Sequence, residues 1–148
     1  MEFELLDREA PLTVEHFSKL AEQGFYNELL FFQHLSGIFL KSGCPRNNGT
    51  GYPGYLLKSE LMQLDTVHDR GVLSMVCGRN NTIGSQFIVC LERIEEFDRH
   101  HVCIGKLRIQ GGWDVLYKLR RFDQILNIEL GELDDSPEME DQEDDLDL

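Results

Sequence analysis

Two short apolar runs flank a polar loop near the middle of the chain, within residues 69–89. The runs cover residues 72–76 and 86–91, and the polar residues between them, 78–85, include two glycines that bound the loop. Apolar segments of this length that end in glycine and asparagine predict two strands joined by a loop. A glycine-bounded loop held between strands can offer backbone donors and acceptors to a guest chain. We therefore interpret this stretch as a peptide-binding surface.

Alternating or continuous apolar positions predict further strands elsewhere in the chain. These strands are expected at residues 2–5, in two pieces of residues 25–43 divided at Ser36-Gly37, at residues 101–107 and at residues 125–130. Residues 44–55 hold three Gly, two Pro and two Asn. That composition predicts a long loop, and long loops in compact domains tend to be functional.

Two helices are expected beside these strands. The first follows Pro11, with Thr13 as its N-cap and Gly24 at its end. The second covers residues 113–119, with inward-facing Val115, Leu116 and Leu119. Many short strands with only two helices predict a mainly β fold, an antiparallel barrel or sandwich, because closure leaves no open sheet edge.

The acidic residues are concentrated at the C-terminus, and this divides the chain. The formal net charge is −13, but nine of the 27 acidic residues lie in residues 134–148, which contain no Lys or Arg. Such a composition cannot bury enough apolar surface to order itself. We predict one domain, residues 1–133, and a disordered acidic tail, residues 134–148, that either keeps the protein soluble or docks a basic protein.

Without the tail, the remaining 18 acidic and 14 basic residues give the domain a charge of −4. We expect no nucleic-acid partner, because the domain offers no basic field, and no membrane partner, because no apolar run is long enough. The first residues lack the features of a secretory signal, so we expect an intracellular protein, cytoplasmic or nuclear, with reduced cysteines. Adjacent His100 and His101 point to opposite faces of a strand, so we expect no metal site.

Five short motifs occur in an order that resembles the cyclophilin family. They are Ala10-Pro11-x-Thr13-Val14, Gly24-Phe25-Tyr26, Asn48-Gly49-Thr50-Gly51, Arg70-Gly71-Val72-Leu73-Ser74-Met75 and Gly84-Ser85-Gln86-Phe87. The resemblance runs from Glu2 to Leu133. It implies an eight-stranded antiparallel β-barrel capped by two helices. It also implies peptidyl-prolyl cis-trans isomerase activity in a groove on the outer face of the barrel, without a cofactor.

The family normally carries one more strand before the strand that begins here at Glu2. That strand pairs with the closing strand, here residues 125–130, so we expect an open seam in the barrel. Three explanations stay open: the chain is truncated, the seam is tolerated, or a partner donates a strand to the edge.

The resemblance also implies a catalytic site with one departure. The family's Phe-His-Arg strand falls on Phe31-Phe32-Gln33, so Gln33 stands where the catalytic arginine belongs. In the family this arginine donates a hydrogen bond toward the proline nitrogen, whose lone pair becomes available only as the peptide bond twists. Lys41 replaces a glutamine that braces the arginine. We therefore expect the catalytic position to be impaired.

The residues that the resemblance implies for peptide binding depart less from the family pattern than the catalytic position does. The apolar proline pocket of the family falls on Ile38, Phe39, Ile88 and Phe97, which replace other apolar residues and so change its shape. Its polar contacts fall on Gln86 and His101, the residue types of the family. Further departures are Val76-Cys77-Gly78 in place of Ala-Asn-Ala and Glu96 in place of a tryptophan at the rim. Two functions stay open: an isomerase of X-Pro bonds in protein folding with weak or lost activity, or a non-catalytic proline-peptide adaptor in a complex. A third possibility is a decayed copy of a family member that binds no ligand.

Overall fold

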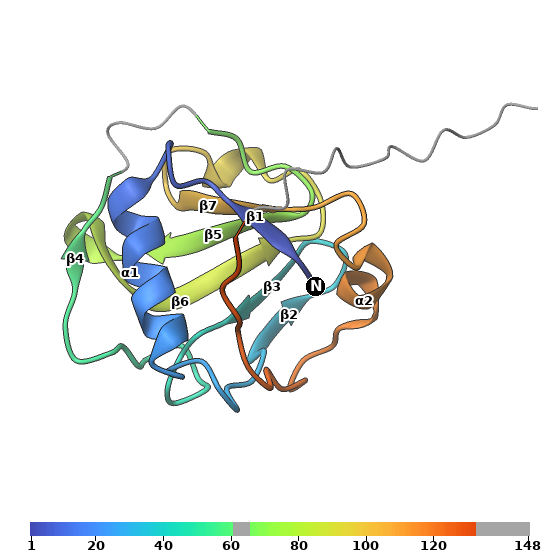
Figure 1. Cartoon of the computed structure of the whole chain (residues 1–148), viewed down its shortest axis with the longest axis horizontal. Helices are drawn as coiled ribbons and strands as arrows, with labels where there is room; N and C mark the ends of the chain where they lie inside the picture. Colours follow the sequence, from blue (N-terminus) through green and yellow to red (C-terminus); the bar gives the residue numbers. More distant parts are fainter. Residues whose placement is uncertain (61–65, 133–148) are drawn as a thin grey trace, which may run out of the picture.

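The computed structural model describes residues 1–60 and 66–132, so the predicted acidic tail, residues 134–148, lies outside the described residues. Seven strands of the described part form one antiparallel sheet in the order β1-β7-β5-β6-β3-β2, with β4 pairing to β6 beside this path (Figure 1). The strands are β1 (Phe3–Leu5), β2 (Gln33–Leu35), β3 (Phe39–Ser42), β4 (Leu57–Lys58), β5 (Val72–Cys77), β6 (Thr82–Cys90) and β7 (Val102–Leu107). The mainly β, antiparallel prediction is confirmed, as an open sheet of seven strands.

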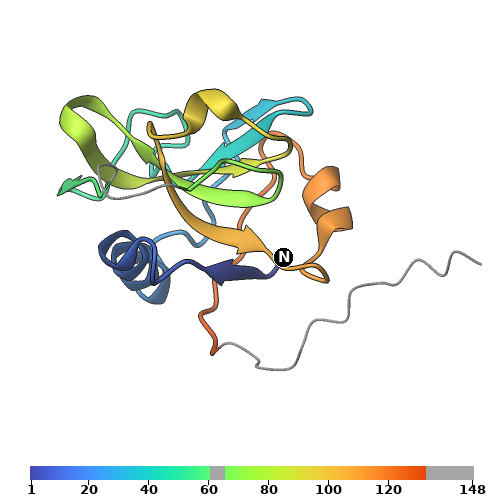
Figure 2. The same cartoon turned by 90° about the horizontal axis from the view of Figure 1, so that it is seen from above.

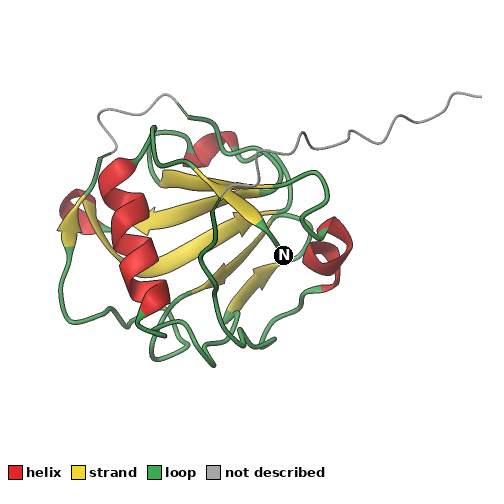
Figure 3. Ribbon diagram, in the orientation of Figure 1, coloured by secondary structure: helices red, strands yellow, loops and turns green. Residues whose placement is uncertain are grey.

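Helices occupy one face and one end of this sheet (Figures 2 and 3). The long helix α1 (Pro11–Glu22) lies along one face, and the short helix α2 (Trp113–Lys118) lies at the end near the N-terminus. Two 3-10 turns, η2 (Arg79–Asn81) and η3 (Glu95–Phe97), connect strands. Among the described residues, no helix has the length and apolar composition needed to cross a bilayer.

The strands bury apolar side chains on both faces of the sheet. Along β6, Phe87 and Val89 join the main core beneath α1, whereas Ile88 and Cys90 join a smaller cluster on the opposite face. This division follows from the two-residue period of a strand, which sends successive side chains to opposite faces. The smaller cluster therefore lies on the face that α1 leaves uncovered.

Helix α1 is capped by a residue from a distant part of the chain. The Glu60 carboxylate accepts hydrogen bonds from the backbone N–H groups of Leu12 at 3.1 Å and Thr13 at 2.9 Å, and from the Thr13 hydroxyl. The prediction that Thr13 is the N-cap is wrong, because the cap residue is Ala10 and its side chain makes no cap bond. A carboxylate at this end also interacts favourably with the helix dipole.

The strand predicted at residues 125–130 is wrong. Among the described residues, backbone hydrogen bonds to the rest of the fold involve only its first residue: the Ile125 N–H donates to the Leu29 carbonyl at 2.8 Å, and the Ile125 carbonyl accepts the Glu28 N–H at 2.8 Å. An isolated bridge joins the preceding residue, Gln124, to Leu30. Beyond them, none of the described strands pairs with the segment, and Leu126 is 78% exposed. Apolar and β-branched residues form a strand only where a partner supplies the hydrogen-bond ladder.

The first strand predicted within residues 25–43 is also shorter than expected. Residues before Gln33 form turns and irregular structure, and the second piece corresponds to β3. Tyr26 is fully buried and donates its hydroxyl to the Ser85 carbonyl at 2.9 Å, while Glu28 has a left-handed φ of 67°. The apolar character of these residues thus reflects burial in the main core rather than pairing in a ladder. Gly37 allows the tight turn between β2 and β3 with a φ of +74°.

Two smaller predictions also differ from the structure. Residues 82–85 belong to β6, so the polar loop predicted at 78–85 is reduced to the turn η2 and its flanking residues. In α2, Leu116 is buried and Leu119 packs against the core, but Val115 is 44% exposed, against prediction. A six-residue helix presents too narrow an apolar stripe to bury all three residues.

Candidate functional site

Gln33, Lys41 and Ile88 form one row across three neighbouring strands. Gln33 of β2 pairs with Lys41 of β3, and Lys41 pairs with Ile88 of β6. Residues paired in this way project to the same face of a sheet. Since Ile88 belongs to the smaller cluster, this is the face opposite α1. The register therefore places the predicted catalytic position beside Lys41 and next to the predicted proline pocket.

The four residues predicted to grip proline lie together on this face, and we call them the apolar cluster: Ile38, Phe39, Ile88 and Phe97. Ile88 is buried, and the other three are half-buried against the same group of residues. The ring centroids of Phe39 and Phe97 are 5.7 Å apart, and the rings of Phe97 and His101 meet edge to face at 4.8 Å. A half-exposed apolar surface edged by aromatic rings suits the ring of a proline.

A buried histidine fixes the segment that carries Phe97. The His68 ring nitrogen Nδ1 lies 3.1 Å from Asp98 Oδ1, and the His68 backbone N–H donates to the same oxygen at 2.7 Å. Arg93 donates to both carboxylate oxygens of Asp98. Burial alone would raise the pKa of Asp98, but the hydrogen bonds from Arg93 and His68 lower that pKa to about 2. Because η3 is held by an ionised network, the Phe97 ring has a fixed position.

The same histidine lies 2.7 Å from the Ser74 hydroxyl through its Nε2 atom. Ser74, His68 and Asp98 thus stand in the order that a serine hydrolase uses. Ser74 and His68 are both completely buried, so neither can reach a substrate. Burial lowers the pKa of His68 despite the neighbouring carboxylate, which keeps the ring neutral between its two partners. We interpret this trio as a structural link between β5 and η3.

His101 offers a hydrogen-bond donor at the edge of the apolar cluster. Its Nδ1 atom accepts the Cys77 backbone N–H at 3.0 Å, which leaves the ring proton on Nε2. Burial, assisted by the Lys41 charge and by the repulsion that protonated His68 or His100 would exert, lowers the pKa of His101 to about 4. The ring is therefore uncharged at neutral pH, and its Nε2–H can donate to a carbonyl of a bound peptide.

Gln86 holds the loop of residues 44–55 against β6. Its Nε2 atom donates to the carbonyls of Gly49 at 2.9 Å and Gly51 at 3.0 Å. The Cys44 sulfur accepts the Gly51 N–H at 3.2 Å. Burial raises the pKa of the Cys44 thiol, but hydrogen bonds from backbone N–H groups of the loop lower it by more. The pKa of Cys44 is therefore lowered overall. The predicted peptide-binding glutamine thus also stabilises one wall of the groove.

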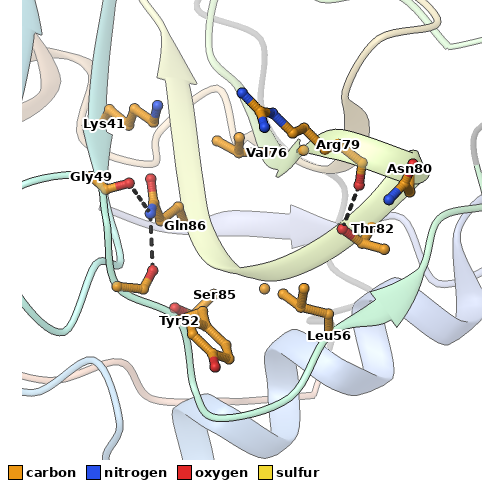
Figure 4. A pocket seen from close by; sticks show the side chains of 13 residues that line it. Lys41, Gly49, Tyr52, Leu56, Val76, Arg79, Asn80, Thr82, Ser85 and Gln86 are labelled. Carbon is orange, nitrogen blue, oxygen red and sulfur yellow. Dashed lines mark hydrogen bonds between the residues drawn. The ribbon is translucent and has the colours of Figure 1, made fainter.

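A cleft of about 440 Å³ opens beside Lys41, the middle residue of the row (Figure 4). Lys41, Gln86 and loop 44–55 form one side, and Arg79 and Asn80 of η2 lie on the other. Burial lowers the pKa of the Lys41 ammonium, whose Nζ atom lies 5.8 Å from the centre of the Phe32 ring. The cleft therefore places a partly desolvated cation next to the apolar cluster.

The structure gathers the residues predicted for the site along one face, although their roles stay predictions. Gln33 is exposed on the edge strand, and Lys41 and Gln86 line the cleft. Arg79 and Tyr52, which also line it, were not predicted. The signal for Arg79 was its place in the glycine-bounded loop, whereas nothing in the local sequence separates Tyr52 from the rest of its long loop.

Comparisons with known proteins give the same family. Residues 1–140 match the family described as cyclophilin type peptidyl-prolyl cis-trans isomerase/CLD. A peptidyl-prolyl cis-trans isomerase of Helicobacter pylori is 37% identical over 125 residues, which cover 84% of this chain and 77% of that protein. One from Synechococcus elongatus is 37% identical over 127 residues, 86% of each chain.

A solved structure has a similar fold. The Cryptosporidium parvum cyclophilin type peptidyl-prolyl cis-trans isomerase, solved in the presence of the dipeptide Ala-Pro, superposes with a TM-score of 0.76. It is 24% identical, and the match covers 88% of this chain and 92% of that one. The predicted cyclophilin-like fold is thereby confirmed. This chain belongs to the cyclophilin type peptidyl-prolyl cis-trans isomerase family.

Proposed function

We propose that this protein binds X-Pro segments of other proteins across the apolar cluster and isomerises them only weakly. The observation that carries the proposal is the row of side chains across β2, β3 and β6. The row joins Gln33, at the predicted arginine position, through Lys41 to Ile88 of the apolar cluster, which is the part of the predicted site suited to proline. The Ala-Pro dipeptide present with the Cryptosporidium parvum protein supports proline as the ligand.

The chemistry requires rotation about a peptide bond whose barrier is about 18–20 kcal/mol, held up by amide resonance. A donor placed at the proline nitrogen lowers that barrier, because the lone pair becomes free to accept a hydrogen bond only in the twisted state. Gln33 can donate through its neutral amide but carries no charge. A charge-assisted hydrogen bond is worth about 1.5–3 kcal/mol, and each 1.36 kcal/mol is about tenfold in rate. We therefore expect turnover roughly one to two orders of magnitude below that of an arginine-bearing cyclophilin.

Other residues of the groove bind and orient the guest in this proposal. The apolar cluster holds the proline ring, and neutral His101 donates to a peptide carbonyl. Gln86 keeps loop 44–55 in place and presents its side-chain oxygen to the groove. Each of these steps is non-covalent, so the residues of the chain are sufficient for the reaction.

The second candidate function is a non-catalytic adaptor that docks proline-containing partners, with the acidic tail available to a basic protein. The uncharged side chain of Gln33 favours this alternative, because a site without a cation at that position can bind a proline peptide and still leave its isomers unchanged. The expected intracellular location suits both functions.

Binding and turnover measured on one peptide separate these functions. We suggest a short neutral peptide with one Ala-Pro bond, and the same peptide with alanine replacing proline as the control for binding. Selective binding of the proline peptide with slow turnover in a protease-coupled assay is the result we expect. Selective binding with no turnover supports the adaptor, and no preference for proline at millimolar peptide overturns both.

A further inference from the structure

The cleft beside the apolar cluster has an unusual charge. Lys41 and Arg79 both line it, and neither Asp nor Glu is among its lining residues. Figure 4 shows the Arg79 side chain extending from η2 toward the side where the Lys41 amine lies. In the described part of the chain, neither cation has a carboxylate partner within ion-pair distance. Two unneutralised cations thus face one hollow.

We propose that this cleft selects guest peptides that carry an Asp or Glu side chain within two residues of the proline. The proposal rests on the proposed function, since it assumes that the proline ring occupies the apolar cluster. It assigns a specificity role to Arg79, which the resemblance to the family does not mark, and a charge-recognition role to Lys41.

The distance from the proline follows from the geometry of β6. Gln86 lines the cleft and Ile88 belongs to the apolar cluster, and the two side chains project to the same face because they are two residues apart. A strand rises by about 3.3 Å per residue, so the two positions are separated by roughly 7 Å. An extended guest covers that distance with two residues. A side chain one or two positions from the proline therefore reaches the cleft.

The position of Arg79 is set by a tight turn. The Gly78 N–H donates to the Thr82 carbonyl at 2.8 Å, and the Thr82 hydroxyl donates back to the Arg79 carbonyl at 2.8 Å. Asn80, at the centre of η2, has a left-handed φ of 58°. These bonds fix the backbone from which the guanidinium extends, so less conformational freedom is lost when it meets an anion.

Lys41 supplies the second cation in a partly dehydrated setting. Burial lowers the pKa of its ammonium, which means that the charged form lacks a full compensating environment. A guest carboxylate in the cleft would supply that compensation. An anion between Lys41 and Arg79 would therefore be held more strongly than one at an exposed lysine.

The charge of the whole protein makes this local arrangement specific. The chain carries a net charge of −13, so its overall field repels an acidic peptide. Two unpaired cations in one cleft are consequently not a by-product of a basic surface. The attraction acts only on an anion that enters the cleft.

Affinities of matched peptides test this inference on the full-length protein. The series starts from a neutral peptide with one Ala-Pro bond, and places Glu or its neutral isostere Gln at each of the two positions before and after the Ala-Pro pair. We expect Glu to bind about five- to tenfold more tightly than Gln at one position at least, at low salt. The preference should shrink at 0.5 M salt, as screening requires.

Variants identify the groups responsible. Arg79→Gln and Lys41→Gln should each bring the ratio of Glu to Gln affinity close to one, whereas Lys118→Gln, which removes an exposed cation from α2, should leave that ratio unchanged. Equal affinities for Glu and Gln peptides at all positions, with the neutral peptide still bound, would overturn this inference and leave the proposed function standing. If neither the neutral peptide nor any of its variants binds, the proposed function fails and this inference fails with it.

Discussion

The two ends of the row across β2, β3 and β6 are built differently. At the Ile88 end, apolar side chains pack on one another, and η3 is held by the ion pair of Arg93 and Asp98 and by the hydrogen bond from His68 to Asp98. At the Gln33 end, a neutral amide stands exposed on an edge strand beside a half-buried lysine. The contrast teaches that the two ends can change independently, and in the proposed function the Ile88 end binds proline while the Gln33 end lacks the charged donor.

The largest effect is expected from returning an arginine to the Gln33 end. Gln33→Arg adds a planar cation that could donate a charge-assisted hydrogen bond to the twisted proline nitrogen. Turnover should therefore rise roughly ten- to a hundredfold. A new cation at this position faces Lys41 directly across the ladder, and like charges so placed repel each other. The double variant Gln33→Arg, Lys41→Gln should therefore be faster than the single one. A protease-coupled assay measures both, and unchanged turnover in both would contradict our account of this end.

Truncating the aromatic ring at the other end should act on binding. Phe97→Ala removes the ring that contacts Phe39 and His101, and the loss of apolar contact predicts an affinity for an Ala-Pro peptide lower by about tenfold or more. Titration calorimetry or NMR titration measures the change. Tyr117→Ala on α2 is the matched control, because that ring is exposed and belongs to another element. Equal affinities of the Phe97 variant and the wild type would show that proline binds elsewhere.

The histidines of the Ile88 end should make folding sensitive to acid. His101 has a pKa of about 4 in the folded protein against about 6.5 when unfolded, so between these values the unfolded chain binds more protons. The free energy of unfolding should fall as pH decreases from 6.5 to 4, by at most about 3 kcal/mol from this residue. His68, whose pKa is also lowered, adds to the same trend.

Denaturant unfolding at several pH values checks this prediction. His101→Asn should reduce the slope between pH 6.5 and 4. The Asp98 carboxyl, with a pKa of about 2 in the folded protein against 3.8 when unfolded, adds to the loss only at the acid end of this window, so the range from pH 6.5 to 5 reports the histidines. Constant stability of the wild type across the window would contradict the assignment of buried, neutral rings.

The smallest effect concerns a group outside the groove and serves as a reference for pure stability. Glu60→Gln removes the charge that caps α1, so the free energy of unfolding should fall by about 1–2 kcal/mol. Peptide affinity should stay the same at temperatures where both proteins are folded. A parallel loss of affinity would show that groove variants cannot be interpreted separately from folding.

Local sequence predicted the elements that depend on local pattern. Strands β5 and β6 were found from their apolar runs, and the turn between β2 and β3 from Gly37. Residues 125–130 were wrongly predicted as a strand, because a strand requires a pairing partner and the sequence pattern does not reveal one. The cap of α1 was missed for a similar reason, since Glu60 lies 47 residues from Thr13.

The site likewise combines features that could be predicted from the sequence with features that depend on contacts between distant segments. The resemblance to the family supplied Ile38, Ile88 and Phe97 as members of one pocket, which no spacing would have joined. The pairing of Gln33 with Lys41 depends on strand register, and the fixed position of Phe97 depends on the long-range bond from His68 to Asp98. Such features arise from contacts between distant segments, so the local pattern carried no signal for them.

Exchange between the cis and trans forms of one Ala-Pro peptide, followed by NMR with the wild-type protein, tests the central claim most directly. Chemical-shift changes on titration report binding, and exchange cross-peaks report isomerisation in the same sample. We predict clear saturable binding with exchange roughly ten- to a hundredfold slower than with an arginine-bearing cyclophilin at equal occupancy. Exchange as fast as with that enzyme would contradict the claim that Gln33 separates binding from catalysis.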